Sequence, residues 1–425
     1  MVVELINTGS ELMLGRVLNS HQQWLCRNLS DHGYIVSRQV AVPDTESDIE
    51  QVVREALGRA DLVITTGGLG PTSDDRTRDR IAALLGRELR EDAEVLAHIK
   101  TIFDRLKRPM LDRTRVQALV PEGAIVLHNA YGTAPGLALK VQPNPFRPGV
   151  SGSWLIMLPG PPRELRPMFT DAVIPLLQRE LPSSVPFVCT TLRTTGLGES
   201  IVEEKIAEPL APLVASGLDV GYCARPGQVD VRLSARGSDA ENLVRKAEAV
   251  VVPLLGGRIF ANGDEDLARV IVKQFIERKK TLALAESCTG GLIAHELTNV
   301  PGASAVLLAG IVAYSNEAKQ MFLGVQSQTI AQYGAVSEAV ARQMAAGARE
   351  RTRADYAVSV TGIAGPAGGT ASKPVGTVFI GLAGPVDTLA EHYFNPYDRE
   401  TFKQVSAQQA LELLRRKALY ESQSG

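Results

Sequence analysis

A serine in the last third of the chain stands where a nucleophile could act. The stretch TLALAESCTGGLIAHEL predicts a buried strand that runs directly into the segment Glu286 to Gly291, which contains Ser287, and then a helix. Free amides at the start of such a helix, here those of Thr289, Gly290 and Gly291, can stabilise an oxyanion. The alternative is that Ser287 only caps the helix, which is a frequent role of serine.

Two further strand ends carry polar or glycine-rich segments. GIVAYSNEAKQMFLGV places Tyr314 at a strand end and Lys319 in the first helical turn, and ADYAVSVTGIAGPAGGT ends an apolar strand at Thr361, before a glycine-rich loop. Taken singly, Lys319 is typical of a solvated helix lysine and Tyr314 of a half-buried strand aromatic. Because an open α/β sheet builds its crevice at the carboxyl ends of its strands, the three segments together predict a catalytic crevice.

Another glycine-rich loop follows a buried strand in the first third of the chain. In DLVITTGGLGPTSDDRTRD, Gly67, Gly68 and Gly70 would let backbone amides approach a phosphate, and the next helix would direct its positive end to the same place. Asp74 and Asp75 are suited to holding a divalent cation between themselves and a phosphate. The alternative is a tight turn followed by an acidic helix N-cap.

The elements that must position these loops alternate in the first third as in an open α/β sheet. Apolar runs predict strands at residues 2–6, 34–42, 62–65, 137–141 and 154–158. Helical spacing of apolar residues predicts helices at residues 19–29, 48–57, 76–85, 91–106 and 162–181. The proline-rich VQPNPFRPGVSGS is expected to form a loop or a hairpin tip.

The middle of the chain predicts a smaller unit. Strands at residues 187–193, 218–222 and 228–235 and helices at 199–207 and 240–255 give the order β-α-β-β-α. GGRIFANGDED then looks like a linker to a third unit, which begins with a helix at 267–275 and a strand at 281–285. We expect an open-sheet α/β domain over residues 1–182, a small α+β connector over 183–256 and a second α/β domain over 264–425.

The composition is that of an ordinary globular protein. With 425 residues, 44% of them hydrophobic, the chain is neither disordered nor collagen-like. The 45 Lys+Arg nearly balance the 47 Asp+Glu, so the basic domain typical of nucleic-acid binding is absent. No apolar run approaches the roughly 20 residues that cross a bilayer, and no secretory signal is visible. Four scattered cysteines indicate a reducing compartment, so we expect a cytoplasmic protein that binds neither nucleic acid nor membrane.

The motifs of the last unit resemble a known family. AESCTGG, YSNEAK, GAVSE, TGIAGP and KPVGTV stand in the order found in the C-terminal domain of CinA, which also occurs alone as the nicotinamide mononucleotide amidohydrolase PncC. The resemblance covers about residues 264–420. It implies Ser287 as nucleophile and Tyr314 and Lys319 as its activating partners. In NPYDRE the glycine usual before the Asp-Arg pair is missing, so a substrate or phosphate contact by Arg399 is left open.

The residue types suggest how such a site would work. A serine hydroxyl needs a base, and no Ser-His-Asp set presents itself among six scattered histidines. Lys319 can serve if burial keeps its amine neutral, and Tyr314 could relay or share the proton. The acyl-enzyme would then be hydrolysed by water. Thr361, Gly362 and Gly365 begin the loop that is the candidate cradle for a substrate phosphate. No cofactor is expected for this domain.

The first unit resembles the MoaB/MogA type of molybdopterin-binding fold and, more specifically, the N-terminal half of CinA proteins. GSELMLGRVLNS, VPDTESD, GGLGPTSDD and LPGPPRELRPMF carry this resemblance over about residues 1–255. That region of CinA is described as a metal-dependent pyrophosphatase acting on ADP-ribose. The resemblance implies metal-binding carboxylates at Asp44 and Asp75, with Asp74 beside them, and nucleotide contacts at Glu11, Asn19, Thr72 and the three glycines. A divalent metal of unspecified identity is expected.

Together these observations predict a CinA-type nicotinamide-nucleotide amidohydrolase with ADP-ribose pyrophosphatase activity in its first domain. The ligands expected are nicotinamide mononucleotide and ADP-ribose, and the resemblance implies a homodimer. The alternative is a nucleotide-sensing or competence-related protein whose N-terminal pocket binds without turnover. Composition excludes neither reading for the first domain.

Overall fold

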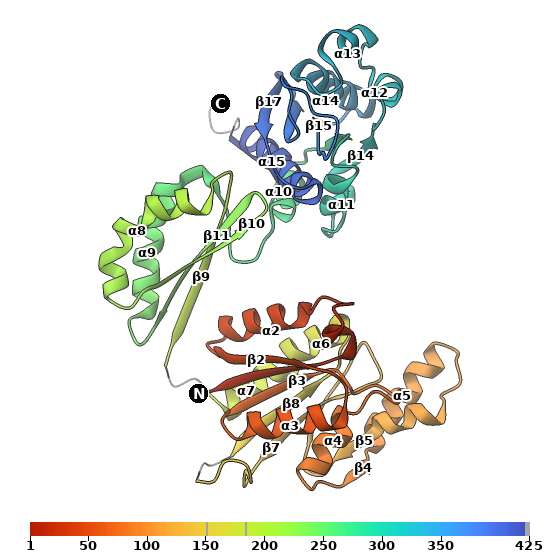
Figure 1. Cartoon of the computed structure of the whole chain (residues 1–425), viewed down its shortest axis with the longest axis vertical. Helices are drawn as coiled ribbons and strands as arrows, with labels where there is room; N and C mark the ends of the chain where they lie inside the picture. The colour runs from red at the N-terminus through yellow and green to blue at the C-terminus, as the bar shows by residue number, and fades with distance from the viewer. Residues whose placement is uncertain (150–151, 183–184, 421–425) are drawn as a thin grey trace. The chain divides into compact units, whose positions relative to one another are not determined.

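The computed structural model describes residues 1–149, 152–182 and 185–420, and the chain divides into two compact units, Met1–Phe187 and Val188–Gly425. The first unit contains a six-stranded sheet in the order β2-β1-β3-β8-β7-β6 (Figure 1). Its parallel strands are β2 (Val36–Val42), β1 (Val3–Thr8), β3 (Leu62–Thr66) and β8 (Ser153–Leu158). The strands β7 (Gly136–Val141) and β6 (Ile125–Leu127) continue it in antiparallel pairs. The strands β1, β3 and β8 are buried along their whole length, as is typical of parallel strands covered on both faces. Only β8 reads as a nearly continuous apolar run, whereas β1 also buries Glu4 and Asn7.

Helices cover both faces of this sheet, and an apolar core lies between the sheet and the helices on each face (Figure 1). One core takes Ile49 of α3 (Glu46–Leu57), Ile81 of α4 (Thr77–Leu84) and Ile99 of α5 (Ala93–Arg105). The other takes Leu25 of α2 (Ser20–Asp31), Leu165 of α6 (Pro162–Met168) and Leu177 of α7 (Ile174–Glu180). The predicted open α/β sheet is confirmed.

Several short elements of the first unit were not predicted. A short helix, α1 (Ser10–Met13), follows β1, and β4 (Leu89–Glu91) pairs with β5 (Leu119–Pro121) after the 3₁₀ turn η1 (Asp112–Ala118). Three or four residues are too few to show a period in the sequence. The helix predicted over 162–181 is interrupted by a π-helical turn, η2 (Phe169–Val173), between α6 and α7. The loop between β7 and β8 connects a hairpin as expected, although positions 150 and 151 lie outside the described residues.

The second unit begins with a four-stranded sheet in the order β10-β11-β9-β12. The strands are β9 (Phe187–Thr195), β10 (Asp219–Arg225), β11 (Gln228–Arg236) and β12 (Ile259–Asn262), and α8 (Glu199–Ala215) and α9 (Ala240–Leu255) pack on the sheet. The expected linker GGRIFANGDED is therefore wrong in part, because it contains the 3₁₀ turn η3 (Gly256–Arg258) and strand β12. Ile259 packs against the core of this sheet, whereas Phe260 enters the core of the next one, which explains why the segment is ordered.

The last sheet has the order β14-β13-β15-β16-β17. The strands β13 (Leu282–Glu286), β14 (Leu307–Val312) and β15 (Tyr356–Gly362) are parallel to one another. The strand β16 (Thr377–Ala383) pairs antiparallel with β15, and β17 (Thr388–Phe394) pairs antiparallel with β16. Hence the three strands predicted to end in functional loops are neighbours and point the same way.

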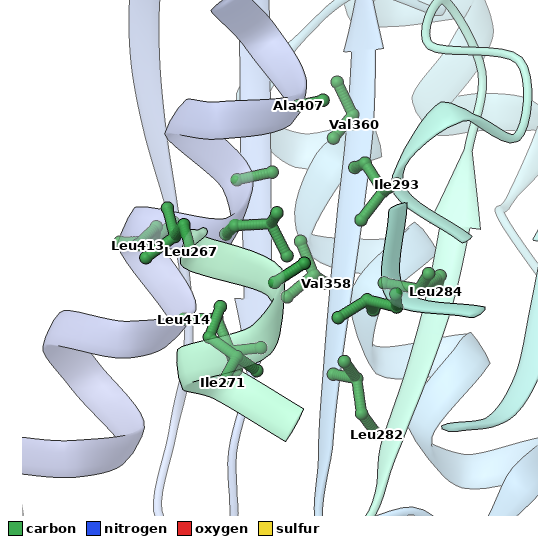
Figure 2. Close-up of a cluster of buried hydrophobic side chains, with 14 of the residues drawn as sticks. Leu267, Ile271, Leu282, Leu284, Ile293, Val358, Val360, Ala407, Leu413 and Leu414 are labelled. Carbon is green, nitrogen blue, oxygen red and sulfur yellow. The ribbon is translucent and has the colours of Figure 1, made fainter. Parts of the chain in front are cut away.

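Helices also sandwich this sheet. Figure 2 shows Leu267 and Ile271 of α10 (Leu267–Glu277) and Leu413 and Leu414 of α15 (Arg399–Tyr420) packed toward the sheet residues Leu284 and Val358. The same core includes Ile293 of α11 (Leu292–Thr298), which follows β13, and the 3₁₀ turn η4 (Ala303–Ala305) precedes β14. The other core is formed with α12 (Asn316–Leu323), α13 (Ser327–Tyr333) and α14 (Glu338–Thr352). Across the described ranges, no helix is both long enough and apolar enough to cross a bilayer.

Candidate active sites

Ser287 and Lys319 meet at the carboxyl ends of β13 and β14. Ser287 directly follows β13, and Lys319 lies in the first turns of α12, where the Ser315 hydroxyl caps the helix. Nζ of Lys319 lies 3.0 Å from Oγ of Ser287. Both residues are buried, Lys319 with 2% and Ser287 with 8% of its surface exposed. The fold thus joins two groups that the sequence separates by 32 positions.

The other contacts of the Lys319 amine are with two backbone carbonyls. Nζ also lies 3.0 Å from the carbonyl oxygen of Ala313 and 3.2 Å from that of Tyr314. A neutral amine has two N–H donors, which these carbonyls accept, so its lone pair is left to accept the hydroxyl proton of Ser287. Burial lowers the pKa of Lys319, because desolvation disfavours the charged ammonium. The geometry is that of a serine paired with an amine base.

The alternative reading of Ser287 as a helix cap does not hold, because Glu286 caps α11. The buried Glu286 carboxylate accepts bonds from the amides of Gly291 at 2.9 Å, Ile293 at 3.2 Å and Ala294 at 2.9 Å. These are amides that a helix start leaves without partners. The hydroxyl of Ser287 is therefore not needed at the helix end and bonds with Lys319 instead.

The predicted oxyanion donors need a correction. The amide of Gly291 already donates to Glu286, and the amide of Gly290 donates to the Ser287 carbonyl at 3.1 Å. Since both amides are satisfied within the chain, the geometry does not favour them as donors to a substrate. Within the described part of the chain, the amide of Thr289 donates to no backbone carbonyl, and the Thr289 hydroxyl is buried without a partner. The Thr289 amide does interact with the sulfur of Cys288, so none of the three amides is favoured over the others as an oxyanion donor.

The Tyr314 phenol contacts Arg399 in this structure, whereas the sequence suggested that it relays or shares the serine proton. Its hydroxyl accepts a bond from Nη2 of Arg399 at 2.7 Å, and its side chain is exposed. Nη1 of the same arginine donates to the Gly365 carbonyl at 2.9 Å. Tyr314 therefore serves Lys319 through its carbonyl oxygen, whereas its phenol contacts Arg399. The contacts of Arg399 place it between two of the predicted functional loops.

The first two residues of the glycine-rich loop have structural partners. The buried Thr361 hydroxyl donates to the Ala335 carbonyl at 2.9 Å, in the GAVSE segment. A side chain at Gly362 would approach the Phe402 ring within 3.0 Å, so glycine is needed for packing there. Lys373, in the KPVGTV motif, also contacts the GAVSE segment, because its amine donates to the Val336 carbonyl at 2.6 Å. Of the predicted loop contacts, Gly365 is the one that Arg399 ties to the crevice.

Cys288, the neighbour of the candidate nucleophile, points away from it. Its side chain belongs to the core that Figure 2 displays in part, and only 6% of the residue is exposed. Burial raises the pKa of the Cys288 thiol to about 12. A thiol held neutral in an apolar core is a poor nucleophile, so the geometry favours Ser287 over its more reactive neighbour.

In the first unit, a cavity of about 570 Å³ lies at the carboxyl end of the parallel strands. Its lining includes most residues that the sequence suggested for this site: Glu11, Asp44, Gly67, Gly68, Gly70, Asp74 and Asp75. Thr8, which ends β1, and Pro159, which follows β8, complete the same edge. The structure thus brings the N-terminal motifs to one place.

Several predicted residues of this site act on the chain itself. The Asp75 carboxylate accepts bonds from the amide and hydroxyl of Thr72, and the Asp44 carboxylate accepts the Ser10 amide at 2.8 Å. Asn19 caps α2 by accepting the Gln22 amide. Neither Asn19 nor Thr72 lines the cavity, so the geometry gives both a positioning role rather than direct nucleotide contact.

The cavity contains residues that sequence reasoning missed. Glu164 contributes a fifth carboxylate and accepts a bond from the Asn129 amide nitrogen at 2.9 Å, while Gly132 packs against it. His21 and Gln117 also line it. PGPPRE was a signal for Glu164, because it ends a strand and starts a helix, whereas nothing in the sequence marks Gln117.

The donor set of this cavity suits a cation that arrives with a phosphate. No lysine or arginine is among the lining residues, while five carboxylates are. Nowhere in the described ranges do three histidine, cysteine or acidic side chains gather closely enough to hold a metal by themselves. Mg²⁺ is commonly held by one or two carboxylates together with substrate phosphates. Asp44, Asp74 and Asp75 therefore fit a metal that the substrate helps to bind.

Comparison with known families divides the chain into three parts. Residues 264–418 match the CinA C-terminal domain, residues 4–179 match the probable molybdopterin binding domain, and residues 190–261 match the damage-inducible protein CinA KH domain. KH domains that clamp nucleic acid use a Gly-x-x-Gly loop, and residues 190–261 contain no such sequence.

Relatives match this chain along nearly the whole length of both proteins. A CinA-like protein of Akkermansia muciniphila is 42% identical over 96% of this chain and 95% of its own length. A putative competence-damage inducible protein of Symbiobacterium thermophilum is 42% identical over 98% of both chains. The solved structure of a competence/damage inducible protein from Agrobacterium tumefaciens is 44% identical over 35% of this chain and 92% of its own, with a TM-score of 0.35. The chain belongs to the CinA family.

Proposed function

We propose that the C-terminal domain hydrolyses the carboxamide of nicotinamide mononucleotide to release ammonia. The observation that carries this proposal is the buried contact of Ser287 with Lys319, whose remaining bonds are made with two carbonyls. Such an amine can take the serine proton without a histidine or a metal. The resemblance to PncC supplies the substrate, since the geometry alone favours acyl transfer without naming the amide.

The proposed reaction proceeds in two steps. As Oγ of Ser287 attacks the carboxamide carbon, its proton passes to Nζ of Lys319. The C–N bond then breaks as the lysine returns that proton to the leaving ammonia, and an ester of nicotinic acid mononucleotide with Ser287 remains. Water attacks this ester, Lys319 takes the proton from the water and gives it to the departing serine oxygen. Nicotinic acid mononucleotide leaves and the site is restored.

Ammonia release from nicotinamide mononucleotide tests this proposal, with Ser287→Ala as the inactive variant and Cys288→Ala as its matched neighbour. Both substitutions remove one heavy atom next to the same turn. Ammonia release that persists in Ser287→Ala and is lost in Cys288→Ala would contradict the assignment.

For the N-terminal domain we propose metal-dependent hydrolysis of ADP-ribose to AMP and ribose 5-phosphate. A pyrophosphate entering a cavity lined by five carboxylates is repelled unless a cation accompanies it. Asp44, Asp74 and Asp75 are the residues that would hold a divalent metal, which neutralises pyrophosphate charge when bound. A sensor that binds the nucleotide without turnover remains the second candidate, because the residues found here also suit simple binding. Formation of AMP with and without Mg²⁺ distinguishes the two.

We also propose a cytoplasmic homodimer that binds no nucleic acid. The surface that supports the dimer lies on the edge strand β14 and helix α12, where Leu308, Val312, Met321 and Phe322 are exposed. Exposed apolar patches of this kind are commonly covered by a partner. Phe322→Asp should lower the molar mass measured by sedimentation if a second copy covers this patch.

A further inference from the structure

Two cations at the start of α15 lie beside the loops that carry the candidate active site. Arg399 bonds with the Tyr314 hydroxyl and the Gly365 carbonyl. One helical turn later stands Lys403. Its Nζ lies 3.8 Å from the position that a Cβ would occupy at Gly290. Lys403 therefore adjoins the loop that begins with Ser287, on the same helix as Arg399.

Among the residues that the structure describes, Lys403 has no partner, in contrast to Glu286 and Arg399. It is half-buried, yet across the described residues its amine forms no hydrogen bond or ion pair. The Glu286 carboxylate, by contrast, accepts hydrogen bonds from three amides. The Arg399 guanidinium donates to the Gly365 carbonyl and to the Tyr314 hydroxyl. A partly desolvated ammonium without a counter-charge is unfavourable, so its place beside an open glycine loop suggests that an anion binds there.

We propose that Lys403, together with Arg399, forms a subsite for the phosphate group of a mononucleotide substrate. The inference rests on the proposed amidohydrolase function and assigns the other end of its substrate. A phosphate monoester carries between one and two negative charges at neutral pH, which two cations neutralise. Lys403 adjoins Gly290 rather than Ser287, where Lys319 already acts. It therefore binds the substrate without touching the reacting atoms and sets the preference for a nucleotide over its nucleoside.

The test compares nicotinamide mononucleotide with nicotinamide riboside, which lacks the phosphate. Lys403→Met should lower kcat/KM for the mononucleotide about tenfold or more, mainly through KM, because a charge-assisted contact is lost. The value for the riboside should stay unchanged. Lys417→Met, fourteen residues further along the same helix and about 21 Å away, is the matched control and should alter neither. Lys403→Arg should restore most of the preference.

Binding in the Ser287→Ala background separates this inference from the proposed reaction. Titration calorimetry with nicotinamide mononucleotide, and with inorganic phosphate as a second probe, reports the subsite without turnover. The Lys403→Met change should weaken both about tenfold. If wild-type protein releases no ammonia but these binding differences appear, the reaction is wrong and the subsite stands. If Lys403→Met binds both probes as tightly as its parent, or loses activity on mononucleotide and riboside equally, the subsite is wrong.

Discussion

Replacing Lys319 with methionine should abolish the proposed amidohydrolase activity while leaving the protein folded. Methionine has a similar length and fills the buried space, but it can neither accept the Ser287 proton nor donate to the two carbonyls that Lys319 now contacts. Deletion of a catalytic nucleophile or base typically lowers kcat about a thousandfold or more, which corresponds to about 4 kcal/mol in activation free energy. We expect a loss of that size.

The cost to stability should be much smaller than the cost to catalysis. The carbonyl of Ala313, in a buried contact, and that of Tyr314, in a partly buried one, lose a donor, at about 1 kcal/mol each. Against this, the variant no longer has to bury an amine that prefers water. Urea unfolding should therefore place Lys319→Met within about 2 kcal/mol of the wild type, so that inactivity cannot be attributed to unfolding.

The pair should also behave as one unit. Ser287→Ala alone, Lys319→Met alone and the double variant should lose activity to nearly the same extent, because removing either partner already disables proton transfer. The assay is steady-state ammonia release from nicotinamide mononucleotide. A Lys319→Met variant that keeps a tenth of the activity, or losses that multiply in the double variant, would refute a serine activated by this lysine.

Four further predictions follow from other parts of the structure. Cys288→Ala should keep most activity and lose some stability, because its thiol packs in the core; an inactive but folded variant would contradict this. The kcat of ammonia release should rise with pH through the lowered pKa of Lys319, since only the neutral amine accepts a proton, with a midpoint below the ordinary value of about 10.4; a midpoint at that value would show an unperturbed lysine. Burial and the charges of Asp266 and Glu286 raise the pKa of Glu296 to about 7. Its contribution to the free energy of unfolding is therefore present below about pH 4.3 and is lost as the pH rises to about 7. The Glu296→Gln variant should show a flatter pH dependence of unfolding in that window, and an unchanged profile would argue against the raised pKa. AMP formation from ADP-ribose should require a divalent metal and fall sharply in Asp75→Ala, and equal rates with and without metal in both proteins would contradict the N-terminal proposal.

Much of the fold could be predicted from the sequence because its strands and helices have clear patterns. The buried strand that becomes β13 and the amphipathic helix that becomes α3 show uninterrupted apolar runs or a helical period. The three-residue strands are too short to show either. Strand β12 resembles a linker in the sequence because glycines and acidic residues flank its four residues. Phe260 holds it in place by entering a core that only the folded chain reveals.

The candidate site was predicted in part, for a related reason. The residue types and their places at strand ends indicated Ser287 and Lys319, and the fold brings them within 3.0 Å. What the sequence could not show is which polar groups the protein itself satisfies. The amide of Gly291, predicted to stabilise an oxyanion, donates to the Glu286 carboxylate. The hydroxyl of Tyr314, predicted to relay a proton, accepts a hydrogen bond from Arg399. Lys403 was missed because a lysine in a helix has no signal of its own until its neighbours are known.

The most direct test of the account is ammonia release from nicotinamide mononucleotide by the full chain in the presence of EDTA. Formation of nicotinic acid mononucleotide and ammonia in equal amounts, unaffected by the chelator and absent in Ser287→Ala, is the expected result. No ammonia from the wild-type protein, or activity that disappears with EDTA, would contradict a metal-free hydrolysis by Ser287 and Lys319.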